Sequence, residues 1–129
     1  MRHKYNQLLQ MNTWDQKATL IIRNLMTSLV KYWQIKTTAK RAKVLKSEMD
    51  KFFSRLVSLF DKYTDEKDVR REAIRYVKTL IFTEEEWKKV VNDLLPKYKD
   101  KGIKSWFIQD FKLGARPWDN AEVVLIKLI

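Results

Sequence analysis

The side chains in this sequence that could bind a partner are mainly cations, and they are concentrated near the start of the chain. Residues 1–46 contain ten Lys or Arg residues and a single acid, Asp15. The whole chain of 129 residues has a formal net charge of +11, so its first third carries nearly all of the excess. Phosphates bound by such side chains release counterions, which drives association with any nucleic-acid sequence. The distribution predicts a polyanionic partner, with nucleic acid favoured and an anionic membrane surface as the alternative.

The sequence offers little material for catalysis. The single histidine, His3, lies in a polar segment where no fixed geometry for a general base is expected. The acids at positions 84–86 fit the first turn of a helix better than a metal site, because consecutive helical residues point in different directions. Gly102 and Gly114 stand alone, so there is no glycine-rich phosphate loop, and the absence of cysteine excludes thiolate chemistry. We expect no enzymatic activity, no cofactor, no metal and no small-molecule substrate.

Helical and extended periodicities divide the chain into four helices and three short strands. The first and the fourth expected helix begin at capping boxes, of Thr13 with Gln16 and of Thr83 with Glu86. The second begins after Thr37 or Thr38, and the third begins after Asp65. Pro96 is expected to end the fourth helix. The expected strands span residues 34–38, 103–111 and 121–129, with a loop at 112–120. This order predicts an α+β fold in which about four helices pack with a small mixed sheet.

The length and the position of these elements predict a single domain, residues 1–129. Its parts are expected to be an extended basic tail at 1–12, a mainly helical region at 13–96 and C-terminal strands at 102–129. The chain has neither a stretch long enough to span a membrane nor the apolar start of a secretion signal. We therefore expect it in the cytosol, or inside an organelle.

The second predicted helix begins with an unusual concentration of positive charge. Lys40, Arg41, Lys43 and Lys46 all lie in its first turns. The amino end of a helix dipole favours acids, so each misplaced cation costs a few tenths, about 0.3 kcal/mol, unless an anion lies nearby. The pattern predicts that phosphate groups approach this helix start.

The five tryptophans are expected to have two kinds of role. Trp33 and Trp87 fall on apolar helical stripes, which predicts that they belong to the core. Trp14, Trp106 and Trp118 fit no stripe. Packing against the core or a partner protein is favoured for these three, and stacking on nucleic-acid bases is the alternative.

Several short motifs can be read together along the chain. They are Met1-Arg2-His3-Lys4, Arg23-Asn24-Leu25, Ser28-Leu29-Val30, Ile35-Lys36-Thr37-Thr38, Lys40 with Ala42-Lys43 and Leu45, Lys112-Leu113-Gly114-Ala115-Arg116, and Asp119-Asn120-Ala121. In this order and at these distances the chain resembles the bacterial ribosomal protein L17 family over essentially its whole length. The combination of motifs carries the resemblance, since no single one is distinctive.

The resemblance implies a non-catalytic constituent of the large ribosomal subunit. Such a protein would bind large-subunit rRNA near the mouth of the peptide exit tunnel and contact neighbouring ribosomal proteins, in the cytoplasmic ribosome or an organellar one. The implied and charge-predicted rRNA contacts are Arg2, His3, Lys4, Arg23, Asn24, Lys36, Thr37, Thr38, Lys40, Arg41, Lys43 and Arg116.

Two other classes of function remain open from the sequence. A DNA-binding regulator would insert a basic helix into the major groove, and it would be expected to dimerise on duplex DNA. A peripheral membrane protein would need an exposed apolar face beside the basic one.

Overall fold

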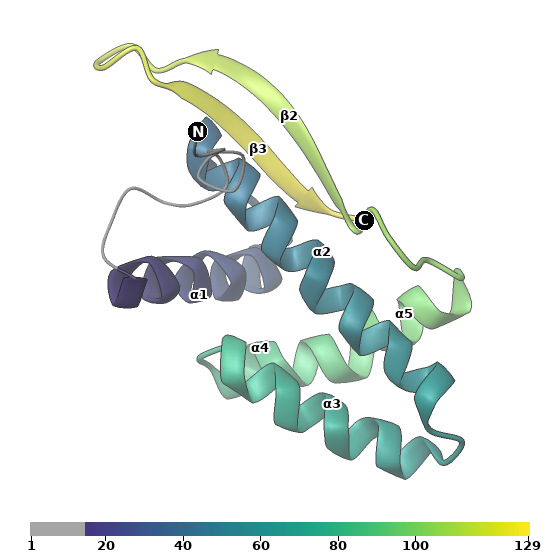
Figure 1. The fold of residues 1–129 in the computed structure, drawn as a ribbon. Coiled ribbons are helices and arrows are strands. Elements are labelled where there is room, and N and C mark those ends of the chain that lie inside the picture. Colours follow the sequence, from purple (N-terminus) through teal and green to yellow (C-terminus); the bar gives the residue numbers. More distant parts are fainter. Residues whose placement is uncertain (1–14) are drawn as a thin grey trace, which may run out of the picture.

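A computed structural model describes residues 15–129 (Figure 1). The predicted basic tail, the first capping box at Thr13, and Arg2, His3, Lys4 and Trp14 lie outside the described residues. The helical elements are α1 (Asp15–Tyr32), α2 (Ala39–Lys62), α3 (Glu66–Leu80), α4 (Glu84–Lys89), the π-helical segment η2 (Val90–Leu94) and α5 (Leu95–Asp100). The strands are β1 (Gln34–Thr38), β2 (Ile108–Ala115) and β3 (Glu122–Leu128).

The predicted α+β class is confirmed, and the three strands form one sheet in the order β1-β3-β2. The prediction of a mixed sheet is wrong, because both pairings are antiparallel. β2 and β3 form a hairpin, and β3 returns alongside β1 in the opposite direction. The last strand therefore lies at the centre of the sheet, between two edge strands.

Helix α2 runs through the middle of the molecule, with the β2–β3 hairpin along one side and α1, α3 and α4 on the other (Figure 1). Its buried side chains recur at helical spacing from Ala42 to Val57 and form the centre of the core. Phe53 packs edge-on against Tyr98 of α5, with ring centroids 5.1 Å apart. Phe107, just before β2, completes the cluster at 5.0 Å from Tyr98 and 5.4 Å from Phe53. These three rings join α2, α5 and the sheet.

The last helix continues beyond its predicted end at Pro96. Residues 84–100 form one run in which α4 passes into η2 and then into α5, with Pro96 in the first turn of α5. A proline ring in a regular helix clashes with the carbonyl four residues earlier. The backbone N–H of Leu95 instead donates to the oxygen of Val90, five residues earlier. This wider turn accommodates the proline, which the sequence pattern alone treats as a helix end.

Two other sequence predictions are corrected by the tertiary structure. Trp33 does not extend the apolar stripe of α1, because it takes a left-handed φ of 66° and is 37% exposed, while Trp87 is half-buried against the core. Strand β2 begins at Ile108, later than predicted, and continues to Ala115, through the first four residues of the predicted loop. Pairing with β3 extends it, and Gly114, with a φ of 94°, accommodates a bulge between Lys112 and Gly114.

The buried hydroxyl of Tyr98 provides a test of this core. Burial raises the pKa of Tyr98 to about 12, and the hydroxyl oxygen has no hydrogen-bond partner among the described residues. A buried polar group without a partner is destabilising. We expect Tyr98→Phe to leave the free energy of unfolding unchanged or to raise it by about 1 kcal/mol, measured by urea denaturation.

Phe107→Ala is the matched comparison, because it removes a ring from the same cluster. It should lower the free energy of unfolding by about 3–5 kcal/mol. A loss of more than about 1 kcal/mol in Tyr98→Phe would mean that the hydroxyl is hydrogen-bonded in solution.

Candidate nucleic-acid interface

The register of the sheet brings two groups of predicted residues to one end of the molecule. Thr38, the last residue of β1, is paired with Val123 at the start of β3, and α2 begins at the next residue. The hairpin loop at 116–121 directly precedes β3, so Arg116 lies at the end of the sheet where α2 starts (Figure 1). Residues about 75 positions apart in sequence thus share one end of the fold. The local sequence pattern of neither segment predicts that they lie close together.

The start of α2 is a concentration of exposed cations. Lys40, Arg41 and Lys43 are exposed, and the first turn of the helix contains no acid. Within residues 15–129, neither Arg41 nor Lys43 forms a salt bridge, and the same holds for Lys36 of β1. The side chain of Thr38, at the N-cap, makes no capping hydrogen bond. The helix start therefore offers both side-chain charge and backbone N–H groups to an anion.

Strand β1 separates the predicted residues onto two faces. Thr37 is paired with the buried Val124, so its side chain lies on the face of the sheet that packs against α2. Lys36 and Thr38 lie on the opposite face, where Lys36 is exposed and Thr38 is half-buried. The structure thus exposes Lys36, leaves Thr38 half-buried next to the start of α2, and turns Thr37 inward.

No contact among the described residues brings Arg23 or Asn24 to this surface. Arg23 is half-buried, and its guanidinium carbon lies 4.0 Å from the centre of the Phe82 ring, in the segment between α3 and α4. Its Nε is buried and has no hydrogen-bond partner among the described residues. Asn24 is exposed on α1. In this fold Arg23 packs the α1 surface against the α3–α4 connection.

Arg116 shapes the hairpin loop. Its Nε donates to Asp119 Oδ1 at 3.1 Å and a terminal nitrogen donates to Oδ2 at 2.5 Å. The backbone N–H of Ala121 also donates to Asp119 Oδ1, at 3.1 Å. The hydrogen bond from Arg116, followed by that from Ala121, lowers the pKa of the Asp119 carboxyl. Trp118 lies over the guanidinium at 5.2 Å and is 77% exposed, so the loop presents an aromatic ring supported by a bidentate ion pair.

Lys127 is a further exposed cation of the sheet, and the charge distribution of the sequence does not single it out. It lies in β3, is exposed, and is paired with Gln34 of β1 on the same face as Lys36. It lies outside the basic first third of the chain. The alternation of Lys127 with the buried Ile126 and Leu128 is the signal that could have identified its outward direction.

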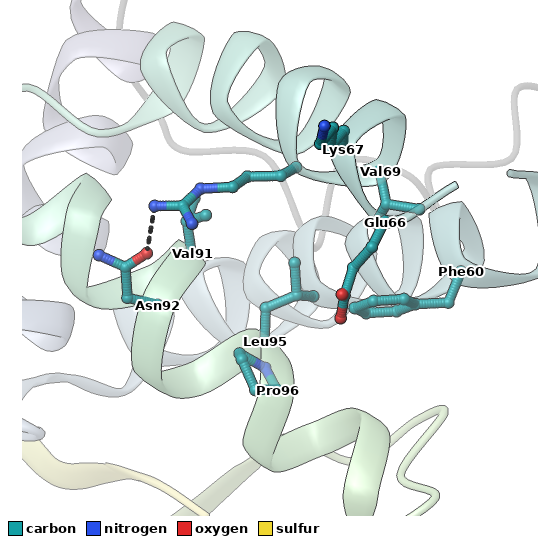
Figure 2. Close-up of a pocket in the computed structure, with 9 residues that line it drawn as sticks. Phe60, Glu66, Lys67, Val69, Val91, Asn92, Leu95 and Pro96 are labelled. Carbon is teal, nitrogen blue, oxygen red and sulfur yellow. Dashed lines mark hydrogen bonds between the residues drawn. The ribbon is translucent and has the colours of Figure 1, made fainter. Parts of the chain in front are cut away.

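A cavity of about 280 Å³ lies far from these cations, between α3 and η2, and Figure 2 shows its lining. Phe60, Val69 and Leu95 supply apolar surface, while Arg70 donates to Asn92 Oδ1 at 3.1 Å across its rim. Glu66 is the only carboxylate in the lining, and none of the lining residues is Ser, Cys or His. The cavity lining thus offers no Ser or Cys nucleophile beside a histidine base.

Among the described residues, no three His, Cys, Asp or Glu side chains gather where a metal ion could be held. None of the helices at 15–129 is both long and apolar enough to cross a bilayer.

Comparison with known proteins agrees with the class that the motifs suggest. The family model described as ribosomal protein L17 matches residues 21–129. The large ribosomal subunit protein bL17 of Thermoanaerobacter sp. (strain X514) is 34% identical over 115 residues, which cover 89% of this chain and 91% of the relative. The protein of the same name from Clostridium tetani is 33% identical over 116 residues, covering 89% and 90%.

These matches make the chain a ribosomal protein of bacterial type. It belongs to the ribosomal protein L17 family. Membership confirms the predicted resemblance, and with it the prediction of a structural component of the cytoplasmic ribosome that is not an enzyme.

The ion pair between Lys46 of α2 and Asp110 of β2 should contribute to stability in a pH-dependent way. Lys46 Nζ lies 2.8 Å from Asp110 Oδ1 of β2, and this hydrogen bond lowers the pKa of the Asp110 carboxyl against the opposing effect of burial. A carboxyl with a lowered pKa stabilises the fold above its unfolded pKa of about 3.9, and the contribution is lost as the pH falls through the folded value. We expect Lys46→Met to lower the free energy of unfolding by about 0.5 kcal/mol at neutral pH, because both groups are partly exposed.

The difference between Lys46→Met and the unchanged chain should shrink in urea denaturation as the pH falls below about 4. Lys51→Met is the control, since it removes only the exposed pair with Glu48 at 3.2 Å and should cost about 0.3 kcal/mol. A difference for Lys46→Met that is the same at neutral and acid pH would show that packing, and not the ion pair, is responsible.

Proposed function

We propose that this chain is a structural constituent of the large ribosomal subunit that binds rRNA through its basic N-terminal third, near the peptide exit tunnel. The observation that carries the proposal is the start of α2, where Arg41 and Lys43 are exposed, have no acidic partner in residues 15–129, and lie in the first two turns of a helix whose first turn contains no acid. Membership of the ribosomal protein L17 family supports the choice of rRNA as the polyanion.

The chemistry of this surface fits recognition of an RNA backbone. Several cations elsewhere on the chain pair with acids, as in Lys88 with Glu84 at 2.6 Å and Arg75 with Glu72 at 3.2 Å, whereas Arg41 and Lys43 form no salt bridge within residues 15–129. Phosphates near the start of α2 would accept hydrogen bonds from Arg41 and Lys43 and lie at the positive end of the helix dipole. Such contacts position the protein on RNA without reading bases, as expected for A-form helices recognised by backbone and shape.

The packing of α2 disfavours insertion into a DNA major groove. A recognition helix presents its amino-terminal residues to base edges along an exposed face. Here Ala42, Leu45 and Met49 are buried between the sheet and the other helices, and Val44 is buried as well. The helix thus offers its exposed end to a partner, and most of its length belongs to the core.

The double variant Arg41→Gln/Lys43→Gln tests the surface. The measurement is binding to protein-free large-subunit rRNA over a series of salt concentrations. Losing two phosphate contacts should weaken binding and flatten the dependence of log K on log salt by roughly 1.5, since each contact contributes about 0.7–0.9.

The control is Lys62→Gln/Lys67→Gln, which removes the same charge at the far end of α2 and the start of α3, where both side chains are exposed. This variant should keep nearly the full salt slope. Equal losses in the two double variants would attribute binding to net charge and refute a localised surface at the start of α2.

A further inference from the structure

The three-stranded sheet has two faces of different composition. Residues paired directly across antiparallel strands project to the same side, so the register assigns each side chain to a face. The inner face contains the buried Val124, Ile126 and Leu128 and packs against α2. The opposite face, called the open face below, consists of Gln34, Lys36, Thr38, Val123, Leu125, Lys127, Gln109, Phe111 and Gly114. Among the described elements, no helix lies across it (Figure 1).

Charge is divided between these two faces. The strands contain two acids, Asp110 and Glu122, and the register places both on the inner face. There Asp110 pairs with Lys46, and Glu122 lies 3.9 Å from Lys112. The open face contains Lys36 and Lys127 and no acidic residue of any strand. It is therefore a positive surface with no internal neutralisation.

An aromatic ring lies beside these cations. Phe111 of β2 is directly opposite Leu125 of β3, which in turn is opposite Lys36 of β1. Neighbouring strands are about 4.8 Å apart, so this row places a ring and an ammonium group on opposite sides of one central strand. Phe111 is 48% exposed, and it stacks on no other aromatic ring among residues 15–129. The next row presents Lys127 between the amides of Gln34 and Gln109.

This composition fits nucleic acid better than a protein partner or a membrane. Protein interfaces have an apolar centre depleted in lysine, whereas here Lys36 and Lys127 flank a single exposed ring. Single-stranded RNA binds to sheets by stacking bases on aromatic side chains while basic groups follow its backbone. Glutamine amides can also both donate to and accept from base edges. Lys36 lies three residues before Ala39, the first residue of α2, so the strand that carries it leads directly to the cations at the helix start.

We propose that the open face is a binding site for unpaired RNA, in which a base stacks on Phe111 and the flanking phosphates contact Lys36 and Lys127. The inference rests on the proposed function, and it adds recognition of a single-stranded segment to contacts with the RNA backbone. The base is held through its ring face, so the site is tolerant of base identity.

The test measures the binding of the full chain to a short single-stranded RNA and to a duplex RNA of the same length. Phe111→Ala should weaken binding to the single strand by about 5- to 100-fold, the loss expected for one stacked base. It should leave duplex binding and the salt slope unchanged, because no charge is removed. Phe111→Tyr keeps a stacking ring and should bind like the unchanged chain.

Two further variants separate stacking from other effects. Leu113→Ala removes a side chain of similar exposure, 50%, from the same strand and should not change RNA binding. Lys127→Gln should reduce the salt slope on single-stranded RNA by about 0.7. Because Phe111 is half-exposed at an edge strand, thermal melting of Phe111→Ala should show that the fold is intact.

The outcomes distinguish this proposal from the one above. If Phe111→Ala binds single-stranded RNA normally while Arg41→Gln/Lys43→Gln loses affinity, the open-face site is refuted and the α2 surface stands. If Phe111→Ala loses affinity for single and double strands alike, or if Phe111→Tyr behaves as Phe111→Ala, stacking is refuted. A loss confined to Phe111→Ala, with the salt slope of Arg41→Gln/Lys43→Gln unchanged, would support the open face and overturn the α2 surface.

Discussion

The structure depends on the packing of one long helix between a sheet and a group of shorter helices. Phe53 of α2 contacts both Tyr98 of α5 and Phe107 at the entrance to β2, so one cluster of rings fixes the helix to both layers. Because β1 leads directly into α2, the orientation of the helix also sets where its amino end emerges beside the sheet. The accessible cations are held in place by this apolar contact, although none of them takes part in it.

The cations of the chain differ in whether an acidic side chain lies close enough to pair with them. Along α3, α4 and the inner face of the sheet, several cations pair with acids, and such exposed pairs contribute little to stability. At the start of α2 and on the open face, acids are absent from the first turn and from the outward strand positions. Positive potential is thereby concentrated at one end of the molecule, where a polyanion would experience it most strongly.

The sequence was sufficient for the class of fold and for the location of the cations, because both follow from local patterns. The β-branched run at Gln34–Thr38 and the cap at Asp65, whose side chain accepts from the Lys67 N–H, were visible in this way. It was insufficient where distant contacts decide. The direction of β1 depends on its pairing with the last strand, and the packing role of Arg23 depends on Phe82, about 60 residues away. The helix beyond Pro96 depends on a π turn with no sequence signature of its own.

The bulge at Gly114 affects how readily the free protein can pair its exposed sheet edge with another copy. β2 is an edge strand of eight residues, with Phe111 and Leu113 exposed along it. A flat strand of this length could add further strands from other copies, which is a route to aggregation. The extra residue between Lys112 and Gly114 bends the edge and interrupts its regular run of backbone donors and acceptors. One irregular residue thus leaves less of this edge regular enough to pair with another copy, while its apolar side chains stay accessible.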